Sequence, residues 1–191
     1  MGSINKTGGK RRKSFQKATP CKTRDRIKQN ILQTNTTKEG ISGKFLLSTL
    51  SSVPDFIGVY AQNELIDMEM YDYPISFVVN LDYSNQDGSH WIGIRINRKR
   101  VEVYDSLGLN PITWDARPSI LLKFLFSFRQ THSIFITPQL QPYRSNICGY
   151  YCLYFITYRY YYPYRYCMSL FSANLHRNDI SLTSVLLSVC K

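Results

Sequence analysis

Three apolar runs in the middle of the chain constrain its fold more than any other feature of the sequence. Residues 75–81 (ISFVVNL) are almost continuously apolar, which is typical of a central strand covered on both faces. Residues 91–96 (WIGIRI) and 100–104 (RVEVY) are rich in β-branched side chains that alternate with others. The short segment between these two runs fits a tight turn, so together they predict a β-hairpin beside the central strand.

Segments before and after these runs predict a further strand and a first helix. Residues 53–60 are expected to turn and then become extended. We expect Pro118 to open a helix, with Thr113 or Asp115 near its cap. Residues 133–137 (SIFIT) are expected to form another short strand. The apolar face of the helix would comprise Ile120, Leu121, Phe124, Leu125 and Phe128.

The last third of the chain predicts two more helices. One is expected to start at Cys148 and to run to about Tyr160, before Pro163 ends it. Asn178 or Asp179 is expected to cap the other. The order of these elements predicts an α+β fold, in which helices pack on a small mixed β-sheet.

Most of the positive charge lies at the start of the sequence. The formal net charge is +11, and residues 1–44 hold 12 Lys and Arg against two acidic residues, whereas residues 45–191 are nearly neutral. The first segment is also poor in large apolar side chains, so it cannot offset the entropy of ordering. We therefore expect residues 1–44 to be a mostly disordered basic tail and residues 45–191 to be the folded domain.

Cysteine usage and hydropathy indicate an intracellular protein. The chain has five cysteines, an odd number, and its start has no apolar core of secretory-signal length. The longest apolar stretch, residues 120–128, is too short to cross a bilayer, so we expect no membrane association. The Cys and His spacings do not match a zinc site, and we expect no metal.

Cys148 is the candidate nucleophile. A thiol attacks as the thiolate, which the first turn of a helix favours through its free N–H groups and dipole. Gly149 would let a substrate carbonyl approach the backbone. The alternative for Cys148 alone is a buried structural cysteine, which is the commoner fate of such a residue.

His90 and Asp105 are the candidate base and its orienting acid. His90 begins the first hairpin strand and Asp105 ends the second, so antiparallel pairing would place both at the same end of the hairpin. The carboxylate would then hold the imidazole tautomer and stabilise the imidazolium. Taken singly, a surface histidine and a turn-forming aspartate are the simpler alternatives.

Gln141 is the candidate oxyanion donor. It lies seven residues before Cys148, and its side-chain amide would join the Cys148 backbone N–H at the developing negative charge. An ordinary polar loop glutamine is the alternative. The joint occurrence of His90, Asp105, Gln141 and Cys148 in this order favours the catalytic interpretation.

The same residues resemble the catalytic blocks of the adenovirus protease family (adenain), whose fold is shared with the SUMO and NEDD8 deconjugating proteases. The resemblance covers about residues 50–160. The blocks are Gly88-Ser89-His90-Trp91, Tyr104-Asp105-Ser106-Leu107-Gly108, and Gln141 followed by Asn146-Ile147-Cys148-Gly149-Tyr150-Tyr151-Cys152.

The resemblance implies a cysteine endopeptidase that cleaves viral precursor proteins during virion maturation, in the host nucleus or the virion. His90 would be the general base, Asp105 its orienter, Cys148 the nucleophile and Gln141 an oxyanion donor. Trp91 would pack beside the site. We expect a monomer that acts on protein substrates and requires no cofactor.

Adenain uses DNA as a cofactor, so the resemblance implies DNA as an activating cofactor here; the basic tail, which has no adenain counterpart, would be the part of this chain that attracts it. Attraction through Lys10, Arg11, Arg12 and Lys13 would follow from counterion release. A solvated leader, a nuclear-import stretch and a cleaved extension are the alternatives. Adenain has Glu where this chain has Asp105, and the cysteine that tethers its activating peptide has no counterpart between Cys21 and Cys148.

The sequence is also compatible with two other functions. One is a deconjugase that removes a ubiquitin-like modifier. The other is a basic nucleic-acid-binding module without enzymatic activity, for which the aromatic and basic run at residues 158–166 would serve as a stacking surface. We expect that run instead to pack its tyrosines on the sheet.

Overall fold

A computed structural model of the chain describes residues 40–67, 73–109 and 119–188. Within these ranges a five-stranded sheet has the order β1 (Phe56–Ala61), β2 (Ile75–Asn80), β3 (Trp91–Ile96), β4 (Arg100–Tyr104) and β5 (Ser133–Ile136). The two outer pairs are parallel and the two inner pairs are antiparallel. The predictions of a mixed sheet in an α+β fold, a hairpin and a late short strand are therefore confirmed.

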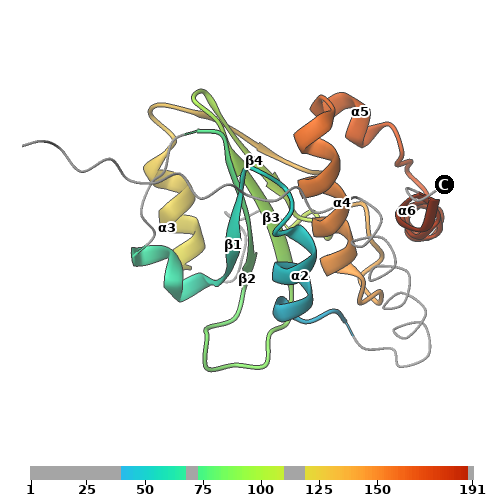
Figure 1. Ribbon diagram of the computed structural model, residues 1–191, viewed down its shortest axis with the longest axis horizontal. Helices are drawn as coiled ribbons and strands as arrows, with labels where there is room; N and C mark the ends of the chain where they lie inside the picture. The colour runs from blue at the N-terminus through green and yellow to red at the C-terminus, as the bar shows by residue number, and fades with distance from the viewer. Residues whose placement is uncertain (1–39, 68–72, 110–118, 189–191) are drawn as a thin grey trace, which may run out of the picture.

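Helices cover both faces of this sheet (Figure 1). The 3₁₀ helix η1 (Gln62–Asp67) and α3 (Ile120–Ser127) lie on one side, and α2 (Gly43–Leu50) and α4 (Cys148–Tyr161) lie on the other. Strand β2 is buried along its whole length because Val78 faces the α4 side while Phe77 and Val79 face the α3 side. Coverage on both faces explains why residues 75–81 are apolar without alternation.

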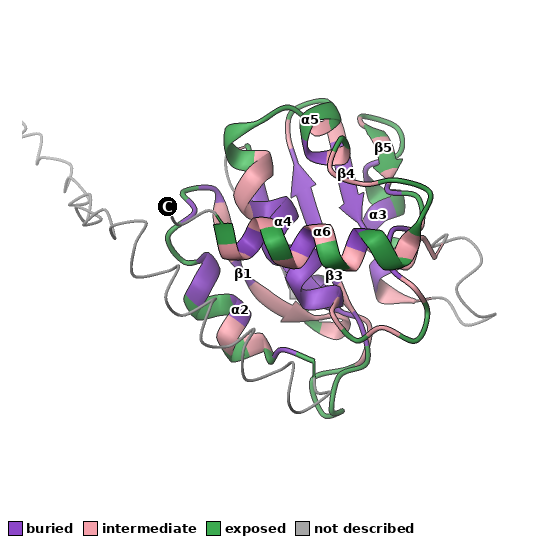
Figure 2. Ribbon diagram, turned by 90° about the vertical axis from the view of Figure 1, so that its right-hand side faces the viewer, coloured by how far each residue is buried: buried purple, intermediate pink, exposed green. Residues whose placement is uncertain are grey.

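Helix α4 is the central helix of its layer. Its first nine residues are all buried, and Figure 2 shows it between the sheet and the partly exposed α6 (Leu175–Ser188). A further short helix, α5 (Tyr164–Met168), follows α4 after Pro163, which ends α4 as predicted. The sheet and α6 thus fix α4 on opposite sides and hold its first residue, Cys148, in place.

Both predicted helix caps differ from the structure. Helix α3 is capped by Ser119, whose hydroxyl accepts the N–H of Leu122 at 3.0 Å. This cap lies directly before the first helical residue, so the expected caps Thr113 and Asp115 are too far upstream; both lie with Pro118 outside the described residues. Within the predicted apolar face, Leu121, Leu125 and Phe128 are buried, and Ile120 and Phe124 are partly buried against the same core.

Helix α6 begins earlier than predicted, so Asn178 and Asp179 are not its caps. Asn174 accepts the N–H of Arg177 at 3.1 Å through its side-chain oxygen. Asn178 instead lies inside the helix and is almost completely buried, with its amide donating to the carbonyls of Leu140 and Ser172. Asn178 therefore ties α6 to the segment that precedes Cys148.

The tyrosines of the run at residues 158–166 do not all pack inward as predicted. Tyr158 stacks on Tyr154 with ring centroids 4.4 Å apart, but four others are exposed. The run starts in the last turn of α4 and continues into α5. Much of it therefore lies beyond the part of α4 that packs on the sheet. The exposed members are Tyr160, Tyr161, Tyr162 and Tyr166.

A buried charge pair connects the far end of α4 to the sheet. Glu102 of β4 is fully buried, and Arg159 of α4 donates to its two carboxylate oxygens at 2.8 and 3.0 Å. The hydroxyl of Tyr104 donates to the same carboxylate. Charged groups are stable inside a protein when they are paired and hydrogen-bonded in this way.

None of the helices within the described ranges is long and apolar enough to span a bilayer. The same ranges also contain no cluster of three or more His, Cys, Asp or Glu side chains placed to hold a metal ion. The basic residues 10–13 and the cysteines Cys21 and Cys190 lie outside the described ranges.

Candidate active site

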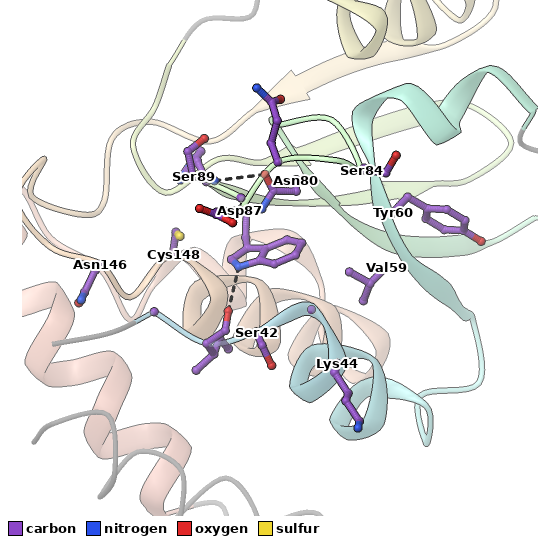
Figure 3. Close-up of a pocket in the computed structure, with 18 of the residues that line it drawn as sticks. Ser42, Lys44, Val59, Tyr60, Asn80, Ser84, Asp87, Ser89, Asn146 and Cys148 are labelled. Atoms are coloured by element: carbon purple, nitrogen blue, oxygen red, sulfur yellow. Dashed lines mark hydrogen bonds between the residues drawn. The ribbon is translucent and has the colours of Figure 1, made fainter. Parts of the chain in front are cut away.

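Cys148 is the first residue of α4 and lines an open cleft of about 860 Å³. Figure 3 shows it between Asn146 on one side and the loop that carries Asp87 and Ser89 on the other. No side chain caps this helix, and among the described residues nothing accepts the backbone N–H of Cys148. The sulfur therefore lies at a helix N-terminus whose partial positive charge favours an anion.

His90 and Asp105 lie together at one end of the β-hairpin. His90 directly precedes β3 and Asp105 directly follows β4, and the antiparallel register brings imidazole Nε2 to 2.8 Å from carboxylate Oδ1. The backbone of His90 is also held, because its carbonyl accepts the N–H of Leu81 at 3.1 Å. The cross-strand contact expected from the sequence is present.

The carboxylate of Asp105 is held in place by burial and by hydrogen bonds. It is fully buried, and it accepts the backbone N–H groups of Leu107 and Leu109, each at 3.0 Å. The hydroxyl of Thr137 donates to the Asp105 carbonyl at 2.7 Å. These contacts leave the carboxylate one orientation toward His90, as an orienting acid requires.

His90 interacts with Cys148 as well as with Asp105. Burial lowers the pKa of the imidazole, but its interactions with Asp105, whose carboxylate accepts its hydrogen bond, and with Cys148 outweigh this effect and raise the pKa to about 9. Since Nε2 contacts Asp105, Nδ1 is the ring nitrogen left for the sulfur. The site thus favours an imidazolium between two groups that can carry negative charge.

Gln141 is buried beside the cleft, which it also lines. Its side-chain nitrogen donates to the carbonyl of Ser145 at 2.6 Å, and its side-chain oxygen accepts from the hydroxyl of Ser106 at 2.6 Å. An amide nitrogen carries two hydrogens, and the described residues supply an acceptor for one of them. The second N–H has no acceptor among the described residues.

Ile41 is part of the site, although the composition of residues 1–44 predicts a basic tail there. Its side chain is 5 % exposed, and its carbonyl accepts the indole N–H of Trp91 at 3.0 Å. A Cβ at position 149 would collide with the Ile41 side chain, so this packing requires Gly149. Ile41 and the start of α2 at Gly43 therefore belong to the described fold, although both lie before residue 45.

The other described cysteines are not placed for catalysis. Cys152 lies one turn after Cys148 but is completely buried, and burial raises its pKa well above the usual value. Burial likewise raises the pKa of Cys167 to about 11. Of the three, Cys148 is the one that lines the cleft.

The two remaining histidines do not line the cleft. His132 packs its ring against Tyr73 and Phe128, with centroids 5.7 and 5.3 Å apart. His176 is exposed on the first turn of α6. His90 is therefore the histidine that the fold brings to the cleft.

Comparison with known proteins identifies similar solved structures. No family model and no curated protein matches the chain. A protease of ASFV is 19 % identical with a TM-score of 0.35, over 56 % of this chain and 43 % of that one. The SUMO protease Ulp1, with its catalytic cysteine oxidised to a sulfonic acid, is 14 % identical with a TM-score of 0.40, over 89 % and 96 %. The Legionella pneumophila effector RavZ is 14 % identical with a TM-score of 0.30, over 77 % and 45 %.

Both proteases in this set belong to the class that the sequence resemblance names, the adenain and deconjugase clan of cysteine proteases. The chain spans less than half the length of the ASFV protease.

Proposed function

We propose that the chain is a cysteine protease in which Cys148 is the nucleophile, His90 the acid and base, and Asp105 the orienting acid. The observation that carries the proposal is one imidazole, hydrogen-bonded to Asp105 and interacting with Cys148, in the lining of the cleft that Cys148 also lines. A nucleophile, a base and a group that orients the base are the arrangement that covalent catalysis needs. The unused N–H groups of Cys148 and Gln141 supply donors for an oxyanion.

The residues define two half-reactions. The Cys148 sulfur, having given its proton to His90, attacks the substrate carbonyl carbon, and the carbonyl oxygen becomes an oxyanion that accepts from Cys148 N–H and Gln141 Nε2. The C–N bond then breaks, His90 donates its proton to the leaving amine, and a thioester remains. A water molecule loses a proton to His90 and attacks the thioester, which releases the acid and returns the proton to sulfur.

The finer proposal, by resemblance, is an endopeptidase that acts on viral precursor proteins. A deconjugase of the same fold would use identical chemistry, so the substrate separates the two. An endopeptidase should cut short peptides of Gly-Gly type, whereas a deconjugase should require the folded ubiquitin-like modifier. Both substrates are therefore to be offered to the same preparation of the full chain.

The proposed chemistry is tested by labelling with an iodoacetamide reporter, followed by mapping of the labelled cysteine. We expect rapid labelling at Cys148 and slow labelling at Cys152 and Cys167, because burial disfavours both of their thiolates. His90→Ala should slow the labelling of Cys148 by at least about 10-fold, since the thiolate loses its paired imidazolium. Equal rates for wild type and His90→Ala would count against a His-activated thiol.

The pH dependence of hydrolysis should have an alkaline limit set by His90. Its pKa is raised from 6.5 to about 9, so the stabilisation from the imidazolium is fully present below pH 6.5 and is lost as the pH rises through 9. We expect kcat/KM of the wild type to fall near pH 9. In Asp105→Asn the fall should move to lower pH, because the carboxylate no longer offsets the lowering of the His90 pKa by burial.

Measuring kcat/KM from pH 5 to 10 checks this expectation, with Asp82→Asn as a matched loss of charge outside the site. An alkaline fall that stays at the same pH in Asp105→Asn would contradict the assignment of the limb to His90. So would a wild-type fall near pH 6.5, the value of an unperturbed imidazole.

A further inference from the structure

Ser106 contacts Gln141 through both its side chain and its backbone. The residue directly follows Asp105 and is 1 % exposed. Its hydroxyl donates to Gln141 Oε1 at 2.6 Å, and its carbonyl accepts the backbone N–H groups of Leu140 and Gln141, each at 2.8 Å. Every one of these contacts joins the turn after β4 to the loop before Cys148.

The contacts around Gln141 allow its amide one orientation. The carbonyl of Ser145 can only accept, so the amide nitrogen must face it, and Oε1 must then face Ser106. The hydroxyl of Ser106 satisfies that buried oxygen. Without the hydroxyl, the oxygen would be buried and unpaired, which is unfavourable enough to turn the amide away.

The same turn also holds the carboxylate that orients His90. The backbone N–H groups of Leu107 and Leu109 donate to the Asp105 carboxylate. Ser106 lies in the same turn, between Asp105 and Leu107 in the chain. The orienting acid and the oxyanion donor are therefore positioned by neighbouring residues. This turn therefore helps to set the distance between the His90 imidazole and the Gln141 amide.

We propose that Ser106 is the positioning residue for the oxyanion donor Gln141, an inference that rests on the proposed protease function. It acts through Gln141 and does not touch the substrate. Losing a well-placed oxyanion donor reduces kcat by about 10²–10³-fold. Misdirecting it should reduce kcat somewhat less, by roughly 10- to 100-fold, and should leave KM nearly unchanged because the effect arises in the transition state.

The test compares Ser106→Ala, Gln141→Ala and the double variant in the full chain. If Ser106 acts through Gln141, the double variant should lose no more activity than Gln141→Ala alone. Ser127→Ala, which removes an exposed hydroxyl at the end of α3, is the matched control and should be fully active. If the loss of activity in the double variant equals the product of the losses in the two single variants, the two residues act independently and the proposal is overturned.

Two reagents distinguish an effect on oxyanion stabilisation from an effect on the reactivity of the Cys148 thiol. Iodoacetamide alkylates Cys148 without forming an oxyanion, so Ser106→Ala should leave its rate unchanged. Acetyl-glycyl-glycinal adds reversibly to the sulfur and turns its carbonyl oxygen into a group that Gln141 would stabilise, so its affinity should fall roughly 10- to 100-fold. An equal loss with both reagents, or loss of cooperative unfolding in Ser106→Ala, would mean a general structural role and overturn the proposal.

The same reagents distinguish this inference from the proposed function. If wild type shows no His90-dependent alkylation and no hydrolysis of either substrate, the protease proposal has failed and the inference falls with it. If wild type is active while Ser106→Ala keeps its kcat and its affinity for the aldehyde, only the role of Ser106 is wrong.

Discussion

Cys148→Ala is expected to abolish peptide-bond hydrolysis, with a loss of roughly 10⁴–10⁶-fold, as when other cooperating nucleophiles are removed. Of the described cysteines it is the one that lines the cleft, and no neighbouring thiol can replace it because Cys152 is completely buried. The fold should remain intact, since the change deletes one atom at a cleft wall and costs about 1 kcal/mol or less. Hydrolysis of a Gly-Gly peptide and of a modifier fusion, followed alongside urea unfolding, measures both expectations.

The matched control is Cys152→Ala, one helical turn away on α4. It also deletes a single sulfur, but from the core, so it should reduce stability slightly while leaving kcat and the alkylation of Cys148 unchanged. The opposite pattern, with activity kept in Cys148→Ala and lost in a folded Cys152→Ala, would show that the nucleophile is wrongly assigned. Activity retained in both would exclude catalysis by either thiol.

The pairing of His90 with Asp105 was predictable because it depends on local information. The two residues flank one hairpin, fifteen positions apart, and the alternating pattern together with the short turn determines which ends meet. The strand at residues 75–81 was predictable for a related reason. Only a strand covered on both faces tolerates so few polar residues.

The contact of Ser106 with Gln141 was not predictable in this way. It joins residues 35 positions apart, and it exists because β5 pairs parallel to β4 and returns the chain to the same end of the sheet. A sequence pattern identifies each strand but does not state which neighbour it pairs with. The pair Asp105-Ser106 at a strand end was visible, but nothing in it pointed to a glutamine so far away.

Ile41 was missed because its surroundings in the sequence are polar and basic. Composition averages over a segment, and one apolar residue among Gly, Ser and Lys does not alter the average. In the structure its side chain fills the space above Gly149 and its carbonyl receives the Trp91 indole. The two helix caps differed for a similar reason, since several polar residues near each helix start were equally able to cap it.

Arg159→Ala is expected to destabilise the protein by roughly 3–5 kcal/mol, because it leaves the carboxylate of Glu102 buried without its principal partner. Glu102 has no exposed surface, and Arg159 supplies two of its hydrogen bonds. The Tyr104 hydroxyl remains, and Arg100 at 3.7 Å is partly exposed, so neither compensates fully. Urea unfolding of the variant and the wild type measures the difference.

The matched control for this prediction is Arg165→Ala, which removes an exposed arginine from α5 and should change stability by no more than about 0.5 kcal/mol. Replacing both partners, as Glu102→Leu with Arg159→Met, should recover most of the loss, because no buried charge is left unpaired. Helix α4 carries Cys148 at its other end, so Arg159→Ala should also lower activity at temperatures near its midpoint of unfolding, and less so far below it. A loss of stability in Arg159→Ala no larger than that in Arg165→Ala would mean that the Arg159–Glu102 pair does not anchor α4 to the sheet.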